Sequence, residues 1–162
     1  MKIAMVRIDE RLIHGQITMG WVRTTGADLI LVANDAVARD SMQKKLMQLA
    51  SPPGVEVEIY SLNEISEKIS AQAWPNKTVL MLVRNPIDFL RLVENGLPIK
   101  KVNIGGVRSP DARIKLTKEV SATDQEMEAW KQLDQLGIRM EVQWVPGAGT
   151  TFLNDVLRSH KG

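Results

Sequence analysis

The chain has 162 residues and a formal net charge of +2, with a pI near 9.0 and no cysteine. This length suits one ordinary domain, and the lack of cysteine excludes disulfides, thiol catalysis and zinc–thiolate sites. The positive residues are scattered and aromatic residues make up only 4% of the chain, which argues against a nucleic-acid-binding protein.

The two ends of the chain carry little functional signal. The apolar start ends at Arg7, so it is too short for a signal peptide. No apolar run in the sequence approaches the ~20 residues of a membrane span, and we therefore expect a cytoplasmic protein. His160, one of two histidines, lies near the carboxyl terminus and is interpreted as unrelated to function.

Apolar runs alternate along the chain with segments of helical spacing. Residues 61–64 and 123–126 have the Ser/Thr-x-x-Glu pattern of a capping box, which marks helix starts. The sequence predicts strands over 2–7, 28–33, 55–60, 78–83, 101–104, 114–120 and 138–145. Between them it predicts a helix over 16–25 that ends at Gly26, a helix over 40–50, a helix that starts at Ser61, a helix between Pro86 and Gly96, and a helix from Thr123 to Gly137. A short terminal helix is expected to hold Phe152 and Leu157.

This alternation predicts an α/β fold. We expect one domain over residues 1–162, built on an open, mostly parallel β-sheet of about seven strands with helices on both faces. Parallel strands need crossover connections, and right-handed crossovers place the helices against the sheet. No linker, repeat or low-complexity tract divides the chain.

In such sheets, ligands bind outside the carboxyl ends of the strands. Four polar or glycine-containing segments follow predicted strands and are expected at that edge: 9–16, 34–35, 84–86 and 105–106. The Walker loop, the Gly-x-Gly-x-x-Gly motif and the Gly-x-Ser-x-Gly elbow are all missing, which disfavours a generic nucleotide-binding domain. The pair Gly105–Gly106 is interpreted as a tight turn that needs unusual backbone angles.

His14 lies in the first of these segments and has a chemistry of its own. A neutral imidazole is a nucleophile, and its unperturbed pKa near 6.5 leaves much of it neutral at pH 7. Attack on phosphorus would give a phosphohistidine with a charge of roughly −1.5 to −2. The guanidinium of Arg11 can donate several hydrogen bonds to such an anion. The backbone N–H groups of Gly15 and Gln16 lie at a predicted helix start, which also favours anions. Asp9 is expected to accept a hydrogen bond from one ring nitrogen and leave the other free.

Purely structural roles stay open for these residues. His14 can be a capping or packing residue, and Asp9 and Arg11 can form a loop ion pair that takes no part in chemistry. Asn34 and Asp35 are typical of turns and helix caps. One histidine away from the terminus cannot form a histidine metal cluster, so the sequence predicts neither a metal nor a cofactor.

The segment RIDERLIHGQ, residues 7–16, resembles the active-site loop of one bacterial family. That family is the IIB component of the mannose/fructose/sorbose class of the sugar phosphotransferase system (PTS). The resemblance covers nearly the whole chain. It continues through Trp21 and through residues 32–35, 50–55, 85–86, 102–106 and 136–137. Two features depart from the pattern: Val107 stands where family members often have methionine, and the 108–113 loop is distinctive.

The resemblance implies a cytoplasmic phosphocarrier. His14 would take a phosphoryl group from a histidine of the IIA component, hold it on Nδ1 and pass it to a hexose-type sugar imported by the membrane components IIC and IID. Arg11 and Asp9 would contact the phosphate and orient the site, with Gly15 and Gln16 as further phosphate- or pocket-binding residues.

The family pattern also includes Asn34 and Asp35 as pocket residues. It implies a separate IIA protein as donor, peripheral association with the membrane components, and no nucleic-acid partner. A homo-oligomer stays open, as does the identity of the sugar. The competing hypothesis is a non-catalytic regulatory module of the same fold that signals by binding a partner.

Overall fold

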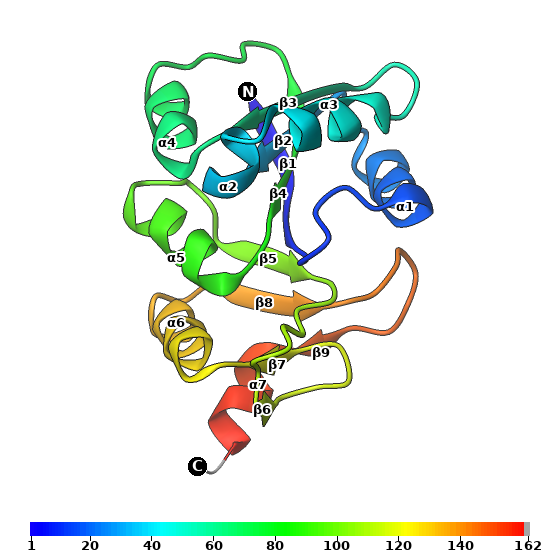
Figure 1. Cartoon of the computed structure of the whole chain (residues 1–162). Coiled ribbons are helices and arrows are strands. Elements are labelled where there is room, and N and C mark those ends of the chain that lie inside the picture. Colours follow the sequence, from blue (N-terminus) through cyan, green and yellow to red (C-terminus); the bar gives the residue numbers. More distant parts are fainter. Residues whose placement is uncertain (161–162) are drawn as a thin grey trace.

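Strands and helices alternate along most of the computed structural model, which describes residues 1–160 (Figure 1). The strands are β1 (Lys2–Ile8), β2 (Leu29–Ala33), β3 (Glu56–Tyr60), β4 (Thr78–Val83), β5 (Lys101–Ile104), β6 (Ile114–Lys115), β7 (Ser121–Ala122), β8 (Arg139–Val142) and β9 (Thr151–Phe152). The helices are α1 (Gly15–Thr25), α2 (Asp35–Ala38), α3 (Ser41–Leu49), α4 (Leu62–Ser70), α5 (Pro86–Glu94), α6 (Asp124–Gln135) and α7 (Leu153–Ser159).

Seven strands form the main sheet, in the order β3-β2-β4-β1-β5-β8-β9. Every neighbouring pair is parallel except β8 and β9. This confirms the predicted open and mostly parallel sheet. β1 lies between β4 and β5, so the loop after β1 leaves from the middle of the edge at which ligands bind in such folds.

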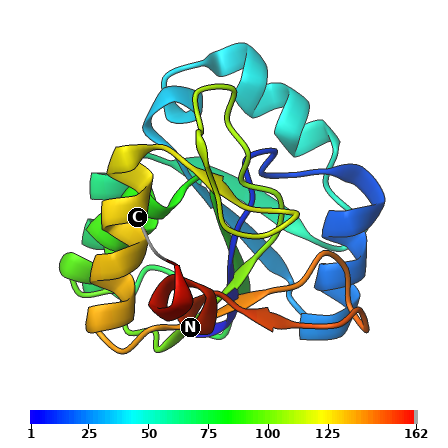
Figure 2. The same ribbon diagram turned by 90° about the horizontal axis from the view of Figure 1, so that it is seen from below.

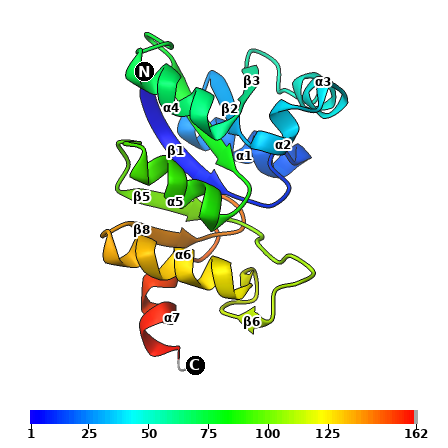
Figure 3. The same cartoon turned by 60° about the vertical axis from the view of Figure 1, so that its left-hand side comes forward.

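Helices cover both faces of the sheet, as Figure 2 shows with α1 and α3 on one side and α4, α5 and α6 on the other. Figure 3 shows α4, α5 and α6 in a row across their face. Successive residues of a strand point to opposite faces, so Leu29 and Leu31 of β2 join one buried cluster, whereas Ile30 and Val32 join the other. Strands buried on both faces explain the continuous apolar runs.

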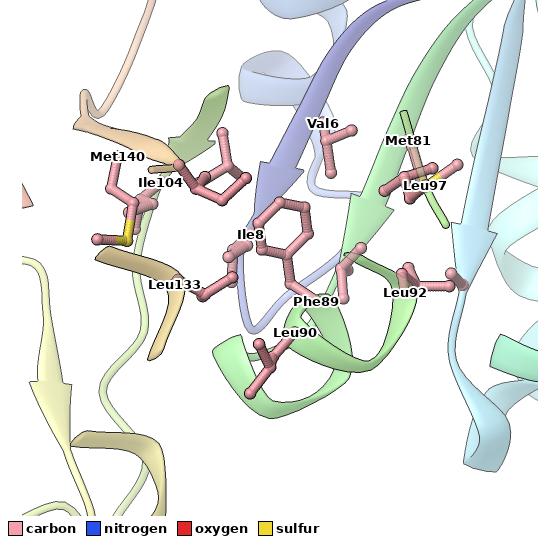
Figure 4. Close-up of a cluster of buried hydrophobic side chains, with 14 of the residues drawn as sticks. Val6, Ile8, Met81, Phe89, Leu90, Leu92, Leu97, Ile104, Leu133 and Met140 are labelled. Carbon is pink, nitrogen blue, oxygen red and sulfur yellow. The ribbon is translucent and has the colours of Figure 1, made fainter. Parts of the chain in front are cut away.

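The larger buried cluster packs β1 against α5 and α6. Val6 and Ile8 of β1 lie beside Phe89 of α5 and Leu133 of α6 (Figure 4). Since Val6 and Ile8 point to this side, the side chain between them points to the α1 side of the sheet. That residue is Arg7, which organises the candidate site.

Local sequence signals account for most helix ends. Ser61 and Thr123 both form the predicted capping box. Each hydroxyl accepts a hydrogen bond from the backbone N–H of the glutamate three residues later, and the side chain of that glutamate accepts from the backbone N–H of the capping residue. Gly26 adopts a left-handed φ of 68° after α1, as the helix stop predicted. Pro86 begins α5, where its missing N–H is not needed.

The prediction of one strand over 114–120 is wrong. Within that segment only Ile114–Lys115 form a strand, β6, which pairs antiparallel with β7, the two residues that follow the segment, in a separate two-stranded sheet. The Thr117 hydroxyl accepts from the N–H groups of Glu119 and Val120 at 3.2 and 3.1 Å and so bends the chain. The seventh strand of the main sheet is instead β9, which is not among the predicted elements, and neither is the short α2.

The predicted strand over 138–145 is also too long, because β8 ends at Val142. The next two residues turn their carbonyl groups to an arginine of β1, as described below. At residues 143 and 144, hydrogen bonds from the side chain of a residue distant in sequence take the place of strand pairing.

Candidate active site

The loop between β1 and α1 is fastened to the strands on both sides of β1. The Asp9 N–H donates to the Val83 carbonyl of β4 at 2.9 Å, and the Glu10 N–H donates to the Gly106 carbonyl beyond β5 at 2.9 Å. Leu12 is buried and donates to the Asp9 carbonyl at 3.0 Å. Its φ of 57° is one that leucine rarely adopts, so packing holds this loop in an uncommon turn.

Arg7 is the hub beneath this loop, and only 2% of its side chain is exposed. Its Nη1 donates to the Asn103 side-chain oxygen of β5 and, at 2.9 Å, to the Gln143 carbonyl. Its Nη2 donates to Asp9 Oδ2 at 3.3 Å and to the Trp144 carbonyl at 3.0 Å. These contacts connect β1 with β5 and with the segment after β8.

Arg7 keeps its charge despite its burial. Burial lowers the pKa of Arg7 to about 10, against the opposing effect of the Asp9 carboxylate. The guanidinium also lies 5.0 Å from the centre of the Trp21 ring, a cation–π distance. Since protein groups surround both Nη atoms, Arg7 holds Asp9 in place and has no face to offer a ligand.

Arg11 is the second arginine on Asp9, and it reaches the surface. Its Nε and Nη2 donate to the two carboxylate oxygens of Asp9 at 3.1 and 3.2 Å, which is a bidentate pair. The Arg11 N–H also donates to Asp9 Oδ1 at 3.0 Å. Its guanidinium lies 4.6 Å from the Trp144 ring centre, and 30% of the side chain is exposed. Arg11 is thus fixed in place but open to solvent.

Position 105 requires glycine because a side chain would have no space there. This corrects the interpretation of Gly105–Gly106 as a tight turn with unusual backbone angles. Neither glycine has a positive φ. A Cβ on Gly105 would lie 2.3 Å from both Arg7 Nη2 and Asp9 Oδ2, far inside contact distance. The buried ion pair therefore occupies the space that any side chain at this position would need.

We predict that Gly105→Ala lowers the free energy of unfolding by about 1–3 kcal/mol, the usual cost of overpacking a filled interior. Denaturant unfolding measures this value. The matched control is Gly149→Ala, since a Cβ there has no neighbour within 4 Å and the residue lacks a positive φ. Equal stabilities of the two variants would contradict the steric role of Gly105.

His14 stands exposed at the start of α1. Its carbonyl accepts from the N–H groups of Ile17 and Thr18 at 3.1 and 3.3 Å, and its own N–H donates to the Thr18 hydroxyl at 2.6 Å. The side chain makes no capping hydrogen bond. The N–H groups of Gly15 and Gln16 have no acceptor within residues 1–160. An exposed imidazole therefore lies next to unsatisfied donors at a helix start, which favours an anion.

The expected hydrogen bond between Asp9 and the His14 ring is not formed among the described residues. The physical reason is that Arg7 and Arg11 already occupy both carboxylate oxygens of Asp9. Asp9 consequently orients Arg11. The tautomer of His14 is left without a fixed partner.

Asn34 and Asp35 lie at the carboxyl end of β2, two strands from β1, and both have structural partners. The Asn34 side chain accepts from the Val37 N–H at 2.9 Å as the cap of α2. Asp35 accepts from the Leu62 N–H at 2.9 Å and lies 3.6 Å from Arg91. These contacts match the turn-and-cap interpretation. Their role in a phosphate pocket stays a prediction.

Most residues that hold the site from below were not predictable from local sequence patterns. Asn103 and Trp144 carried no local signal, because their contacts with Arg7 span 96 and 137 residues. Arg7 did carry one: a charged residue between Val6 and Ile8 in a buried strand requires partners. Arg84, after β4, was placed at this edge, and its Nε donates to the Glu10 carbonyl at 3.1 Å.

The arrangement combines a nucleophile with fixed positive groups. His14 offers an unpaired imidazole, the α1 start offers two N–H donors, and Arg11 offers a guanidinium that Asp9 already orients. Within residues 1–160 no cluster of three or more histidine or carboxylate side chains suits a metal ion. None of the helices in that range is long and apolar enough to cross a bilayer.

Comparisons with known proteins agree on one family. The family model described as "PTS system sorbose subfamily IIB component" matches residues 3–161. The fructose-specific EIIB component of Bacillus subtilis is 35% identical over 98% of each chain. The mannose-specific EIIAB component of Escherichia coli is 35% identical over 90% of this chain, which spans 45% of that protein.

Solved structures agree with this result. The crystal structure of the IIB domain of the sorbose permease from Klebsiella pneumoniae matches with a TM-score of 0.92 and 34% identity, over 99% of both chains. The match spans the sheet, the helices and the β1–α1 loop alike. The chain therefore belongs to the sorbose subfamily of IIB components of the sugar phosphotransferase system.

Proposed function

We propose that the whole chain acts as one cytoplasmic phosphocarrier domain in which His14 accepts a phosphoryl group from a IIA phosphohistidine and transfers it to a sugar. Family membership supports the carrier role, because the relatives are sugar-specific EIIB components. The observation that carries the assignment to His14 is its position, exposed at the α1 start with the Asp9–Arg11 pair on the preceding loop.

In the proposed step, a lone pair of the His14 ring attacks phosphorus. A new N–P bond forms, the N–P bond of the donor histidine breaks, and its electron pair returns to the donor imidazole. Charge develops on the phosphoryl oxygens, and preorganised donors stabilise it without further rearrangement. Arg11 and the N–H groups of Gly15 and Gln16 would supply those donors. No metal or cofactor takes part.

The partners follow from the family. A IIA component is the donor, and the fused EIIAB relative carries both functions in one chain by its name. IIC and IID would present the sugar at the membrane, where this chain would associate peripherally. The relatives are named for different sugars, so the sugar is defined here only as a hexose-type substrate.

The test is phosphoryl transfer in two stages. The purified chain is incubated with phosphorylated IIA, and the label is mapped by mass spectrometry under neutral or alkaline conditions. We expect one acid-labile phosphoryl group on His14. Membranes that contain IIC and IID should then convert it into sugar phosphate. A label on another residue contradicts the proposal, and a label that never reaches sugar favours a regulatory module.

We further predict that Arg11→Lys slows single-turnover transfer on the order of tenfold or more. Lysine keeps one positive charge, but it loses the bidentate pair with Asp9 and the planar stack on Trp144. Rapid-quench measurement of phospho-His14 formation gives this rate. Arg23→Lys is the control, since Arg23 is exposed in the last turn of α1. Equal rates in both variants would exclude a transfer role for Arg11.

A further inference from the structure

We infer that Trp144 is a positioning residue for phosphoryl transfer, acting through the guanidinium of Arg11. This inference rests on the proposed function of His14 and adds a residue to it. Trp144 lies 130 residues beyond His14 in the chain, just after β8 ends at Val142. We expect its effect on transfer to be exerted through Arg11, whose guanidinium carbon lies 4.6 Å from the Trp144 ring centre.

The guanidinium of Arg11 is held in two directions at once. Asp9 holds its edge, with donor–acceptor distances of 3.1 and 3.2 Å from Nε and Nη2. Trp144 holds its face, with the guanidinium carbon 4.6 Å from the ring centre. This bidentate edge contact alone still lets the guanidinium plane hinge about the line through the two carboxylate oxygens. The aromatic face removes that freedom, so the two contacts together fix the plane.

Arg7 secures both supports. Its Nη2 donates to Asp9 Oδ2 at 3.3 Å and to the Trp144 carbonyl at 3.0 Å, from a position that is 2% exposed. The Gln143 carbonyl accepts from Nη1 of the same guanidinium at 2.9 Å, and the Gln143 side chain donates to the Ala148 carbonyl at 3.0 Å. The segment that carries Trp144 is therefore fixed to β1 and is not a loose loop.

The glycine after Gly105 makes room for the tryptophan. A Cβ on Gly106 would lie 3.2 Å from Trp144 Cζ3 and 3.8 Å from Arg11 Nη2. The ring thus fills the space between the loop after β5 and the guanidinium. A smaller side chain at position 144 would leave this space empty and Arg11 free to tilt.

Positioning matters because an unrestrained arginine has many rotamers, and ordering them during transfer would add to the barrier. In the proposed step, the N–P bond to His14 forms as the donor N–P bond breaks, and Arg11 faces the charge on the phosphoryl oxygens. Nη1 of Arg11 makes no hydrogen bond within residues 1–160 and stays available for such an oxygen. Trp144 holds the guanidinium in the orientation that points Nη1 at the phosphoryl oxygen before the phosphate donor binds.

The experiment compares Trp144→Leu with Trp144→Phe, which keeps an aromatic face. Single-turnover phosphorylation of His14 is measured over a range of phosphorylated IIA concentrations, and again with phosphoramidate, a small donor that needs no protein docking. We expect Trp144→Leu to lower the maximal rate about three- to tenfold with both donors, the range that a cation–π contact accounts for. The half-saturating IIA concentration should stay within about twofold, and Trp144→Phe should recover most of the rate.

A spectroscopic signature separates positioning from general damage. Ring current from Trp144 should shift the Nε–H resonance of Arg11, and this shift should vanish in Trp144→Leu and persist in Trp144→Phe. The matched control is Phe152→Leu, which removes the ring 4.7 Å from Arg139 outside the site. Its transfer rate should equal that of the wild type.

Three results would overturn the inference. The first is a wild-type maximal rate in Trp144→Leu, the second is an equal loss in the leucine and phenylalanine variants, and the third is a change confined to the half-saturating IIA concentration. If the wild-type chain accepts no phosphoryl group from either donor, the proposed function fails and the inference fails with it. A labelled wild type with an unaffected Trp144→Leu contradicts only the inference.

Discussion

Replacing His14 by alanine is expected to abolish phosphoryl acceptance from phosphorylated IIA and leave the fold unchanged. The imidazole is exposed and makes no capping hydrogen bond, so its removal leaves no buried group without a partner. The acid-labile label should fall to background, because no other side chain of the loop is a comparable nucleophile at neutral pH. The denaturant midpoint should equal that of the wild type.

The second histidine provides a matched control. His160 lies just beyond α7, far along the chain from the β1–α1 loop, and His160→Ala should accept the phosphoryl group at the wild-type rate. A label that persists in His14→Ala would move the acceptor elsewhere. Loss of the label in both variants would indicate that the assay reports stability and not the acceptor.

Elements that short-range contacts define were predictable from the sequence. The helices starting at Leu62 and Asp124 begin where Ser61 and Thr123 cap them, with all the capping groups within three residues. Inner strands such as β2 and β4 were recognisable because burial on both faces requires continuous apolar runs. The prediction of a strand over 114–120 failed because Ile114, Leu116 and Val120 occupy alternate positions, as in a strand, although Thr117 turns the chain between them.

In the site, too, the features set by short-range contacts were predictable and those set by long-range contacts were not. The position of the β1–α1 loop was predictable, because the loop follows a central parallel strand and its candidate residues are close in sequence. The orientation of Asp9 was not, since it depends on Arg7, and Arg7 in turn depends on carbonyl groups of residues 143 and 144. A sequence read one segment at a time has no means of pairing these groups. The purpose of Gly105 was hidden for the same reason.

Arg7→Met should have the largest effect on stability, lowering the free energy of unfolding by about 3–5 kcal/mol, the typical cost of breaking a buried ion pair by removing one partner. Methionine fills similar volume but donates no hydrogen bond. It would leave the Gln143 and Trp144 carbonyls without their donor, and Asp9 with Arg11 alone. Denaturant unfolding at low temperature measures the loss, with transfer to His14 followed in parallel.

A matched pair elsewhere in the chain isolates the effect of burial. Arg139 and Glu141 of β8 also lie two residues apart in the chain and form an ion pair at 3.8 Å, but the Arg139 side chain is 62% exposed. Arg139→Met should change stability by no more than about 1 kcal/mol, as exposed pairs do. If both variants lose the same free energy of unfolding, burial does not determine how much the Arg7–Asp9 pair contributes to stability.

The cost of burying Arg7 has a structural explanation in the site above it. An apolar residue in β1 would pack on Trp21 without any desolvation penalty, yet it could hold neither Asp9 nor the Trp144 carbonyl. Asp9 and the ring of the same Trp144 are the groups that fix Arg11. We therefore expect Arg7→Met to slow transfer even under conditions where the variant is fully folded. A stability loss without any change in transfer rate would show that Arg7 serves only the fold.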